Sequence, residues 1–247
     1  VQKTYTYFGR LSALKYTNIR FFETQNGDST QLNCYVMLTK SKHKSISFEL
    51  EGTNSAGDLG AAASVSFQHR NLFRGSETFM VKFRGAYEAI SGLQPGYKNH
   101  NYTEYGVETS INFPNFLFPF LTSDFKRRIK ATTEFGLQYN YQLRPEFSRT
   151  IASASWSYKW MQKQKIQHRI DLLDISYLYL PWISSQFQED YINKDKDNYI
   201  LKYNYENRLI VRMGYNYSYN SAGGALVNNT ITTNSYSIRA GFESAGN

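Results

Sequence analysis

Apolar and polar residues alternate along most of the chain from Ser45 onward, which is the pattern of β-strands with two unlike faces. In the first such segment, Ile46, Phe48 and Leu50 alternate with polar or charged residues. The same alternation recurs in segments 59–68, 79–88, 104–113, 129–144, 150–160, 166–177, 208–219 and 235–243. We therefore predict an all-β, antiparallel architecture of about eight to ten strands.

The longest of these segments, 129–144, alternates strictly over sixteen residues. Strands of globular proteins average about five or six residues, whereas a strand that crosses a membrane needs about nine to eleven. Aromatic residues also gather near the ends of the apolar faces, as they do at the two interfaces of a membrane barrel. These residues are Tyr139, Tyr141, Trp156, Trp160, Tyr177, Tyr215, Tyr217 and Tyr219. Strand length and aromatic placement favour a transmembrane β-barrel over a soluble sandwich.

The segment before residue 43 follows a different pattern. Tyr7, Leu11 and Leu14 recur at helical spacing, and segments 18–23 and 31–38 are predicted strands joined by an NGDS turn. One helix and one hairpin bury too little apolar surface to be stable alone. We therefore predict that residues 1–42 are the C-terminal part of a small α+β domain that begins upstream, and that residues 43–247 form the β domain.

Three stretches interrupt the alternation. Segments 90–101 and 221–233 have the composition of loops. Between residues 180 and 207 the sequence is compatible with a helix, a long loop or another strand, so its path stays open. If the count is nine, a bacterial single-chain barrel of even strand number cannot close. Because an open half-barrel would leave backbone groups unpaired in lipid, we expect further strands beyond Asn247.

Composition supports the membrane interpretation without deciding it. Aromatic residues make up 17% of the chain, apolar residues 41%, and the mean hydropathy is −0.55. No run of about 18 apolar residues is present, so a transmembrane helix is excluded. A membrane barrel keeps its average hydropathy low because lumen-facing residues alternate with lipid-facing ones. A soluble all-β protein remains the alternative.

Charge and candidate chemistry exclude several functions. The net charge is +8, but the basic residues are scattered, so we predict no nucleic-acid partner. The only cysteine, Cys34, excludes an intrachain disulfide and is predicted to be a buried strand residue. The four histidines, His43, His69, His100 and His168, lack ligand spacing, and no nucleophile or phosphate-loop motif is present. We predict no enzymatic activity, no cofactor and no metal site.

The paired carboxylates have a structural explanation. Glu49 and Glu51 share one face of a predicted strand, as acid pairs in hydrolases also do. On a barrel wall we expect them to line the lumen and to pair with Lys82, Arg84 or Lys130 across strands.

Residues 44–79, KSISFELEGTNSAGDLGAAASVSFQHRNLFRGSETF, resemble the start of the barrel in the BamA/TamA superfamily of outer-membrane assembly factors. The shared pattern is a strand ending in EGTNSAGD, a second strand, and a turn of the form RNLF-x-G-x-E. The EGTNSAGDLG wording is closest to the lipoprotein branch called TamL. The preceding helix and hairpin resemble the end of the last POTRA domain, a periplasmic α+β module. The resemblance covers essentially the whole chain and is most specific between about 40 and 80.

This resemblance implies a barrel of sixteen strands in the cell outer membrane, with the POTRA part in the periplasm. It implies an insertase that folds client proteins at a weak seam between the first and last strands, by strand templating and local membrane perturbation. Its partners would be the outer-membrane lipid bilayer, nascent outer-membrane protein clients and, as an open option, a periplasmic or inner-membrane accessory protein. A VRGF-type motif and a closing strand belong to the later half of such barrels and do not occur in these residues.

Two candidate sites follow from the resemblance. The lateral-gate strand would be Ser45, Ile46, Ser47, Phe48, Glu49, Leu50, Glu51 and Gly52. Its apolar side chains would face lipid and its backbone would template a client strand by β-augmentation. The periplasmic turn would be Arg70, Asn71, Leu72, Phe73, Arg74, Gly75 and Glu77.

In that turn, we expect Asn71 and Gly75 to be turn formers, with φ > 0 at Gly75. Arg70, Arg74 and Glu77 would lie at headgroup level or against the POTRA part, and Leu72 and Phe73 would anchor the rim or dock that part. A purely structural interfacial turn is the alternative. A passive outer-membrane channel or transport barrel and a two-partner-type secretion pore remain the rival functions.

Overall fold

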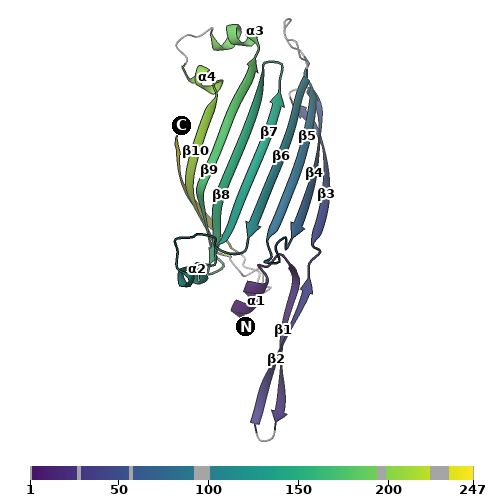
Figure 1. The fold of residues 1–247 in the computed structure, drawn as a ribbon, viewed down its shortest axis with the longest axis vertical. Coiled ribbons are helices and arrows are strands. Elements are labelled where there is room, and N and C mark those ends of the chain that lie inside the picture. The colour runs from purple at the N-terminus through teal and green to yellow at the C-terminus, as the bar shows by residue number, and fades with distance from the viewer. Residues whose placement is uncertain are drawn as a thin grey trace.

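The structure is a computed structural model that describes residues 2–26, 29–55, 58–91, 101–193, 199–222 and 234–246. Within these residues, eleven strands form a two-stranded sheet, β1–β2, and a nine-stranded antiparallel sheet whose order from β3 to β11 follows the sequence (Figure 1). The predicted all-β, antiparallel architecture is confirmed. The strands are β1 Leu14–Asn26, β2 Ser29–Lys40, β3 Lys44–Ser55, β4 Asp58–Arg70, β5 Thr78–Ala89, β6 Asn101–Phe113, β7 Thr132–Leu143, β8 Phe147–Gln162, β9 Ile166–Ile183, β10 Arg208–Asn220 and β11 Ser237–Gly246.

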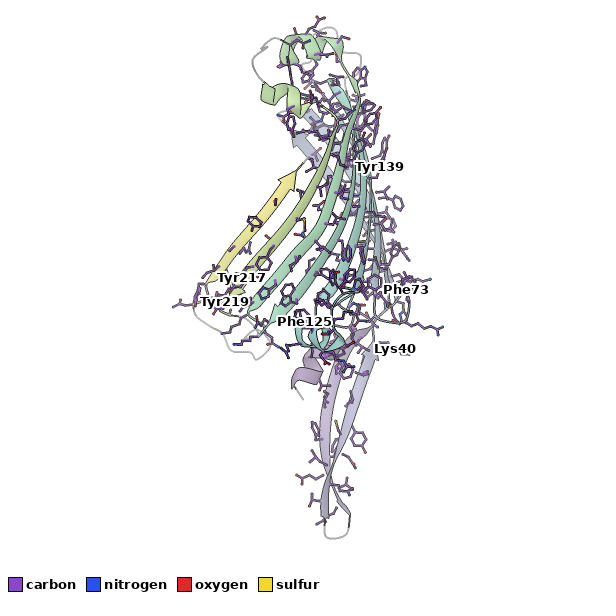
Figure 2. The ribbon with its side chains drawn as sticks, turned by 60° about the vertical axis from the view of Figure 1, so that its left-hand side comes forward. Lys40, Phe73, Phe125, Tyr139, Tyr217 and Tyr219 are labelled. Carbon is purple, nitrogen blue, oxygen red and sulfur yellow. The ribbon has the colours of Figure 1, made fainter. Side chains whose placement is uncertain are left out.

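The large sheet is curled, and the β1–β2 hairpin extends from one end of it (Figures 1 and 2). We call this the hairpin end. Each strand pairs with its neighbours in the sequence, so the sheet is a meander. Within the described residues, β3 pairs only with β4 and β11 pairs only with β10, which leaves one edge of each strand unpaired.

The N-terminal helix is shorter than predicted. Helix α1 spans Gln2–Phe8 and ends before Leu14, which is already the first residue of β1. Gly9 follows the helix directly and has a low helical propensity, which accounts for the early end. Cys34 lies on β2 and is exposed, so the prediction of a buried cysteine is wrong. Both faces of this two-stranded hairpin carry exposed side chains, including Leu32 on one face and Tyr35 on the other.

The strand predicted over 129–144 is also shorter in the structure. Helix α2 spans Ser123–Ile129, and Lys130 ends it with a left-handed φ of 53°. Strand β7 then begins at Thr132 and ends at Leu143. Ile129 and Lys130 happen to continue the apolar–polar alternation of the strand. They lie instead at the end of α2, because the basic residues before them fold as a helical turn.

The undecided stretch between 180 and 207 contains a strand end and short helices. Strand β9 continues to Ile183 and is followed by α3, Ser185–Phe187, and a π-helical turn, Gln188–Ile192. Helix α4, Tyr199–Asn204, precedes β10. Most of the predicted loops 90–101 and 221–233 lies outside the described residues.

The two faces of the large sheet differ sharply in chemistry. One row of cross-strand neighbours runs from β3 to β10 as Phe48, Val65, Phe83, Val107, Tyr139, Ala152, Tyr177 and Leu209. The adjacent row on the other face reads Ser47, Ser66, Lys82, Glu108, Gln138, Ser153, Ser176 and Ile210. We call these the apolar face and the polar face. Figure 2 shows Tyr139 projecting outward from the sheet.

The apolar face is not the inside of a hydrophobic core. Most of its large side chains are exposed, among them Phe48, Phe83, Tyr139, Tyr177 and Leu209. The buried apolar residues of the described chain are few: Ala62, Ala131, Tyr158, Phe187 and Ile192. Among the described residues, none of the helices has the length and apolar character needed to cross a membrane.

Candidate functional site: strand β3 and the β4–β5 turn

The predicted gate residues, Ser45 to Gly52, all lie on β3, the edge strand of the large sheet. Ile46, Phe48 and Leu50 point to the apolar face, and their exposure rises along the strand to 74% at Phe48 and 86% at Leu50. An edge strand presents a row of unpaired N–H and C=O groups to any strand that approaches it. The structure therefore places the predicted residues on one accessible edge.

Ion pairs bind the polar face of β3 to β5, two strands away. The Lys82 Nζ donates to Glu49 Oε2 at 2.9 Å, and the Arg84 Nη2 donates to Glu51 Oε2 at 2.9 Å. The intervening strand β4 carries small residues at this level, and Ala62 and Ser64 lie buried there. Because the β4 side chains are small at this level, the long basic side chains of β5 can extend across β4 and reach the carboxylates of β3.

These pairs confirm two of the three predicted partners. The Ser64 hydroxyl donates a further hydrogen bond to Glu49 at 2.9 Å. Lys130, the third predicted partner, lies instead beside α1, with its Nζ 5.6 Å from the centre of the Tyr7 ring. The left-handed backbone after α2 turns Lys130 away from the strands. The repeated small residues of GAAASVS could have indicated this arrangement in the sequence.

The turn between β4 and β5, residues 70–77, is organised around one carboxylate. Glu77 is only 7% exposed, and its Oε2 accepts hydrogen bonds from the backbone N–H groups of Phe73 at 3.1 Å and Gly75 at 3.0 Å. A carboxylate that satisfies two backbone donors fixes the path of a loop. Glu77 therefore braces the turn from within, and its predicted position at headgroup level or against the POTRA part stays a prediction.

The role of Gly75 also differs from the prediction. Its φ lies outside the left-handed range, whereas Asn71, Arg74 and Ser76 have φ values of 70°, 66° and 69°. A Cβ atom at Gly75 would lie 2.1 Å from Glu77 Oε1. Glycine is thus required here because the buried carboxylate approaches closely. Three non-glycine residues in the left-handed region mark a backbone whose strain the surrounding contacts must offset.

The turn docks against the N-terminal segment through Ser76. Its hydroxyl accepts a hydrogen bond from the Ala13 N–H at 2.9 Å, and its carbonyl accepts one from the Ser12 hydroxyl at 2.7 Å. Ser76 is buried and occupies a variable position of the RNLF-x-G-x-E pattern, so the motif gave no reason to select it. Leu72 and Phe73, which were expected to anchor the rim or dock this segment, have exposed side chains (Figure 2 labels Phe73).

The same turn contacts the first residues leading into β3. The Arg70 N–H donates to the His43 carbonyl at 2.6 Å, and the Arg70 Nη1 donates to the Lys42 carbonyl at 3.2 Å. The Arg70 Nη2 also reaches Gln68 Oε1 at 2.8 Å. The turn, the start of β3 and the segment before β1 therefore form one hydrogen-bonded junction, while the Arg74 side chain is exposed.

Neither chemistry nor similarity assigns this site a known activity. The described residues contain no group of three or more histidine, cysteine, aspartate or glutamate side chains that could hold a metal ion. Comparisons of the chain with protein-family models, with curated proteins and with solved structures found no match. What the arrangement offers is an accessible strand edge beside a rigid junction.

Proposed function

We propose that residues 43–247 form the first part of a transmembrane β-barrel of the outer membrane, and that residues 1–42 end a POTRA domain in the periplasm. The supporting observation is the apolar face, whose large side chains are exposed across the sheet. Soluble monomers rarely expose contiguous apolar patches above a few hundred Å². Lipid would cover this face, and the alternating strands of 10 to 18 residues in the sheet have the length that a bilayer requires.

The polar face supports the same proposal. Charged side chains of both signs pair on it, as in the contacts of Lys82 with Glu49 and of Arg212 with Asp174. In a soluble sandwich, the apolar face would be packed and the charged face solvated. Here the apolar face has no covering layer among the described residues, and the charged face lines the inner side of a curled sheet. A water-filled lumen would suit such a face.

We further propose that the protein assembles outer-membrane proteins by templating client strands on β3. In the bilayer core, an unpaired strand edge is costly, so an incoming client strand gains main-chain hydrogen bonds there. The ion pairs that join β3 to β5 are half-exposed, and pairs of this kind contribute little stability. They hold β3 against its own sheet, and they leave its other edge, which has no paired strand among the described residues, open to a client strand. No cofactor or covalent step is needed.

Site-specific cross-linking tests this function. A cysteine replaces Ser47 on β3 in a Cys34→Ser background, because the exposed native thiol would otherwise react. The probe is an arrested outer-membrane protein with one cysteine in its terminal strand. We expect a disulfide adduct with the Ser47→Cys variant.

The matched control is Gln138→Cys, which lies in the same polar row but on β7, between two paired strands. This variant should give no adduct. A passive channel or secretion pore predicts no client adduct at either position, so that result would contradict the insertase. Adducts of equal yield at both positions would show that the contact is not specific to the strand edge.

A further inference from the structure

The connection between β6 and β7, residues 114–131, forms a rigid platform at the hairpin end (Figure 1). Phe116 and Phe118 pack on the buried ring of Tyr158, with centroid distances of 4.7 and 6.2 Å. The Tyr158 hydroxyl donates to the Leu117 carbonyl at 2.9 Å. These contacts fix a long connection that would otherwise be free to move.

Thr133, the second residue of β7, holds the same connection from the other side. It is fully buried, and its Oγ1 accepts a hydrogen bond from the Leu117 N–H at 2.9 Å. The Thr133 hydroxyl in turn donates to the Asn115 carbonyl at 2.8 Å. The aromatic residues of the connection are therefore held in place by both β7 and β8.

Four cations lie in the second half of this platform. Lys126, Arg127 and Arg128 lie in the last turn of α2, and Lys130 caps the helix in the left-handed conformation. None of the four has an ion-pair partner within the described part of the chain. On the polar face, by contrast, basic side chains such as Lys82 pair with carboxylates. Four unpaired cations within five residues create a positive potential that favours binding of an anionic partner.

A groove runs between these cations and helix α1. It has a volume of about 420 Å³ and is lined by Tyr7, Pro114, Asn115, Phe116, Lys126, Arg127, Lys130 and Ala131. Of the described residues that line the groove, none is acidic. Lys130 lies over the Tyr7 ring at 5.6 Å, which holds its ammonium group beside the groove. The groove thus combines three cations with aromatic walls.

Exposed phenyl rings in the same β6–β7 connection indicate what kind of anion the groove receives. Phe120 is 85% exposed, and Phe125, labelled in Figure 2, is also exposed on α2. Apolar rings next to Lys and Arg are typical of segments that lie in the headgroup region of a membrane. A free phosphate would gain nothing from these rings, whereas a lipid places acyl chains beside them.

We propose that this groove binds the headgroup of an anionic phospholipid, with Lys126, Arg127 and Lys130 contacting its phosphate. This inference rests on the proposed membrane location, because the lipid would belong to the leaflet at the hairpin end. Bound lipid would fix α2, and with it the start of β7, at the membrane surface. The groove also includes Tyr7, so the lipid would join the barrel to the segment before the hairpin.

Native mass spectrometry of the full chain tests the proposal. The purified protein is offered phosphatidylglycerol and phosphatidylcholine with identical acyl chains, and the ratio of bound lipids is measured. Each basic residue near a membrane surface contributes about fivefold to the binding of anionic lipid. We expect the Lys126→Gln/Arg127→Gln/Lys130→Gln variant to reduce the preference for phosphatidylglycerol by at least about tenfold.

The control is Lys163→Gln/Lys165→Gln, which removes two charges and would by the same figure lower a non-specific preference about 25-fold. These lysines lie in the β8–β9 turn at the same end of the sheet, since Lys159 of β8 pairs with the first residue of β7. The control should retain the wild-type preference. A second variant, Lys126→Arg/Arg127→Lys/Lys130→Arg, keeps all charges and should retain it too, which separates lost binding from lost folding.

Three results would overturn the proposal. The triple glutamine variant could keep the wild-type preference, the control could lose it equally, or inorganic phosphate could compete as well as lipid. Failure of the wild type to bind either lipid would instead contradict the proposed membrane location. Wild-type binding of both lipids without preference would contradict only the headgroup site.

Discussion

The sharpest test of the membrane proposal is a charge placed on the apolar face. Leu137 lies on this face of β7, between Thr109 and Ala154, and is 62% exposed. If water covered the face, Leu137→Arg would change the free energy of unfolding by no more than about 0.5 kcal/mol. If lipid covers it, the same change places a guanidinium group in hydrocarbon.

The position of Leu137 along the strand sets the expected size of the effect. It lies five residues after Thr132 and six before Leu143, the two ends of β7. A strand rises about 3.3 Å per residue and is tilted by about 40° in a barrel, so each residue adds about 2.5 Å of height. Leu137 is then about 13 Å above the lower end, near the middle of an apolar band about 25 Å tall.

An arginine at the bilayer midplane costs about 2–4 kcal/mol in barrels of this kind. We expect Leu137→Arg to lower the free energy of unfolding by that amount. The assay is guanidinium-induced unfolding of the protein in phosphatidylcholine vesicles, followed by the fluorescence of its three tryptophans.

The control is Gln138→Arg, the next residue on β7, whose side chain points to the polar face opposite Glu108. This change should cost less than about 1 kcal/mol, because the face is polar and an acid lies opposite. Equal effects at the two positions, or a cost below about 1 kcal/mol at Leu137, would refute the assignment of the apolar face to lipid.

Two further predictions concern the β4–β5 turn. Gly75→Ala should lower the free energy of unfolding by about 1–3 kcal/mol, because its Cβ would displace the buried Glu77 carboxylate. The control is Gly52→Ala, whose Cβ would meet no atom within 4 Å, and it should change the free energy of unfolding by less than about 0.5 kcal/mol. Equal effects of the two substitutions would contradict the proposed role of the Glu77 carboxylate in holding the turn. Ser76→Ala removes the acceptor of the Ala13 N–H, so hydrogen exchange at that amide should accelerate about fivefold, and unchanged exchange would exclude the docking contact.

The sequence alone determined the sheet, because a period of two is a direct consequence of strand geometry. Ile46, Phe48 and Leu50 were assigned to one face from their spacing, and the structure places them there. The pairing of Glu49 with Lys82 was also predicted, because opposite charges on one face attract their neighbours. The same reasoning failed at Ile129 and Lys130, where two residues of matching polarity lie in a helical turn and its cap.

Only the tertiary structure decided how the connections work. The buried brace of Glu77 and the docking of Ser76 depend on backbone groups that come together when β4, β5 and the N-terminal segment meet. The groove between α1 and α2 joins residues more than 100 positions apart, such as Tyr7 and Lys130. Side-chain periodicity reports which face a residue occupies, and it carries no information about such contacts between distant turns. The alternating sequence pattern therefore determines the strands of this protein, whereas the contacts between its turns are determined only when the chain folds.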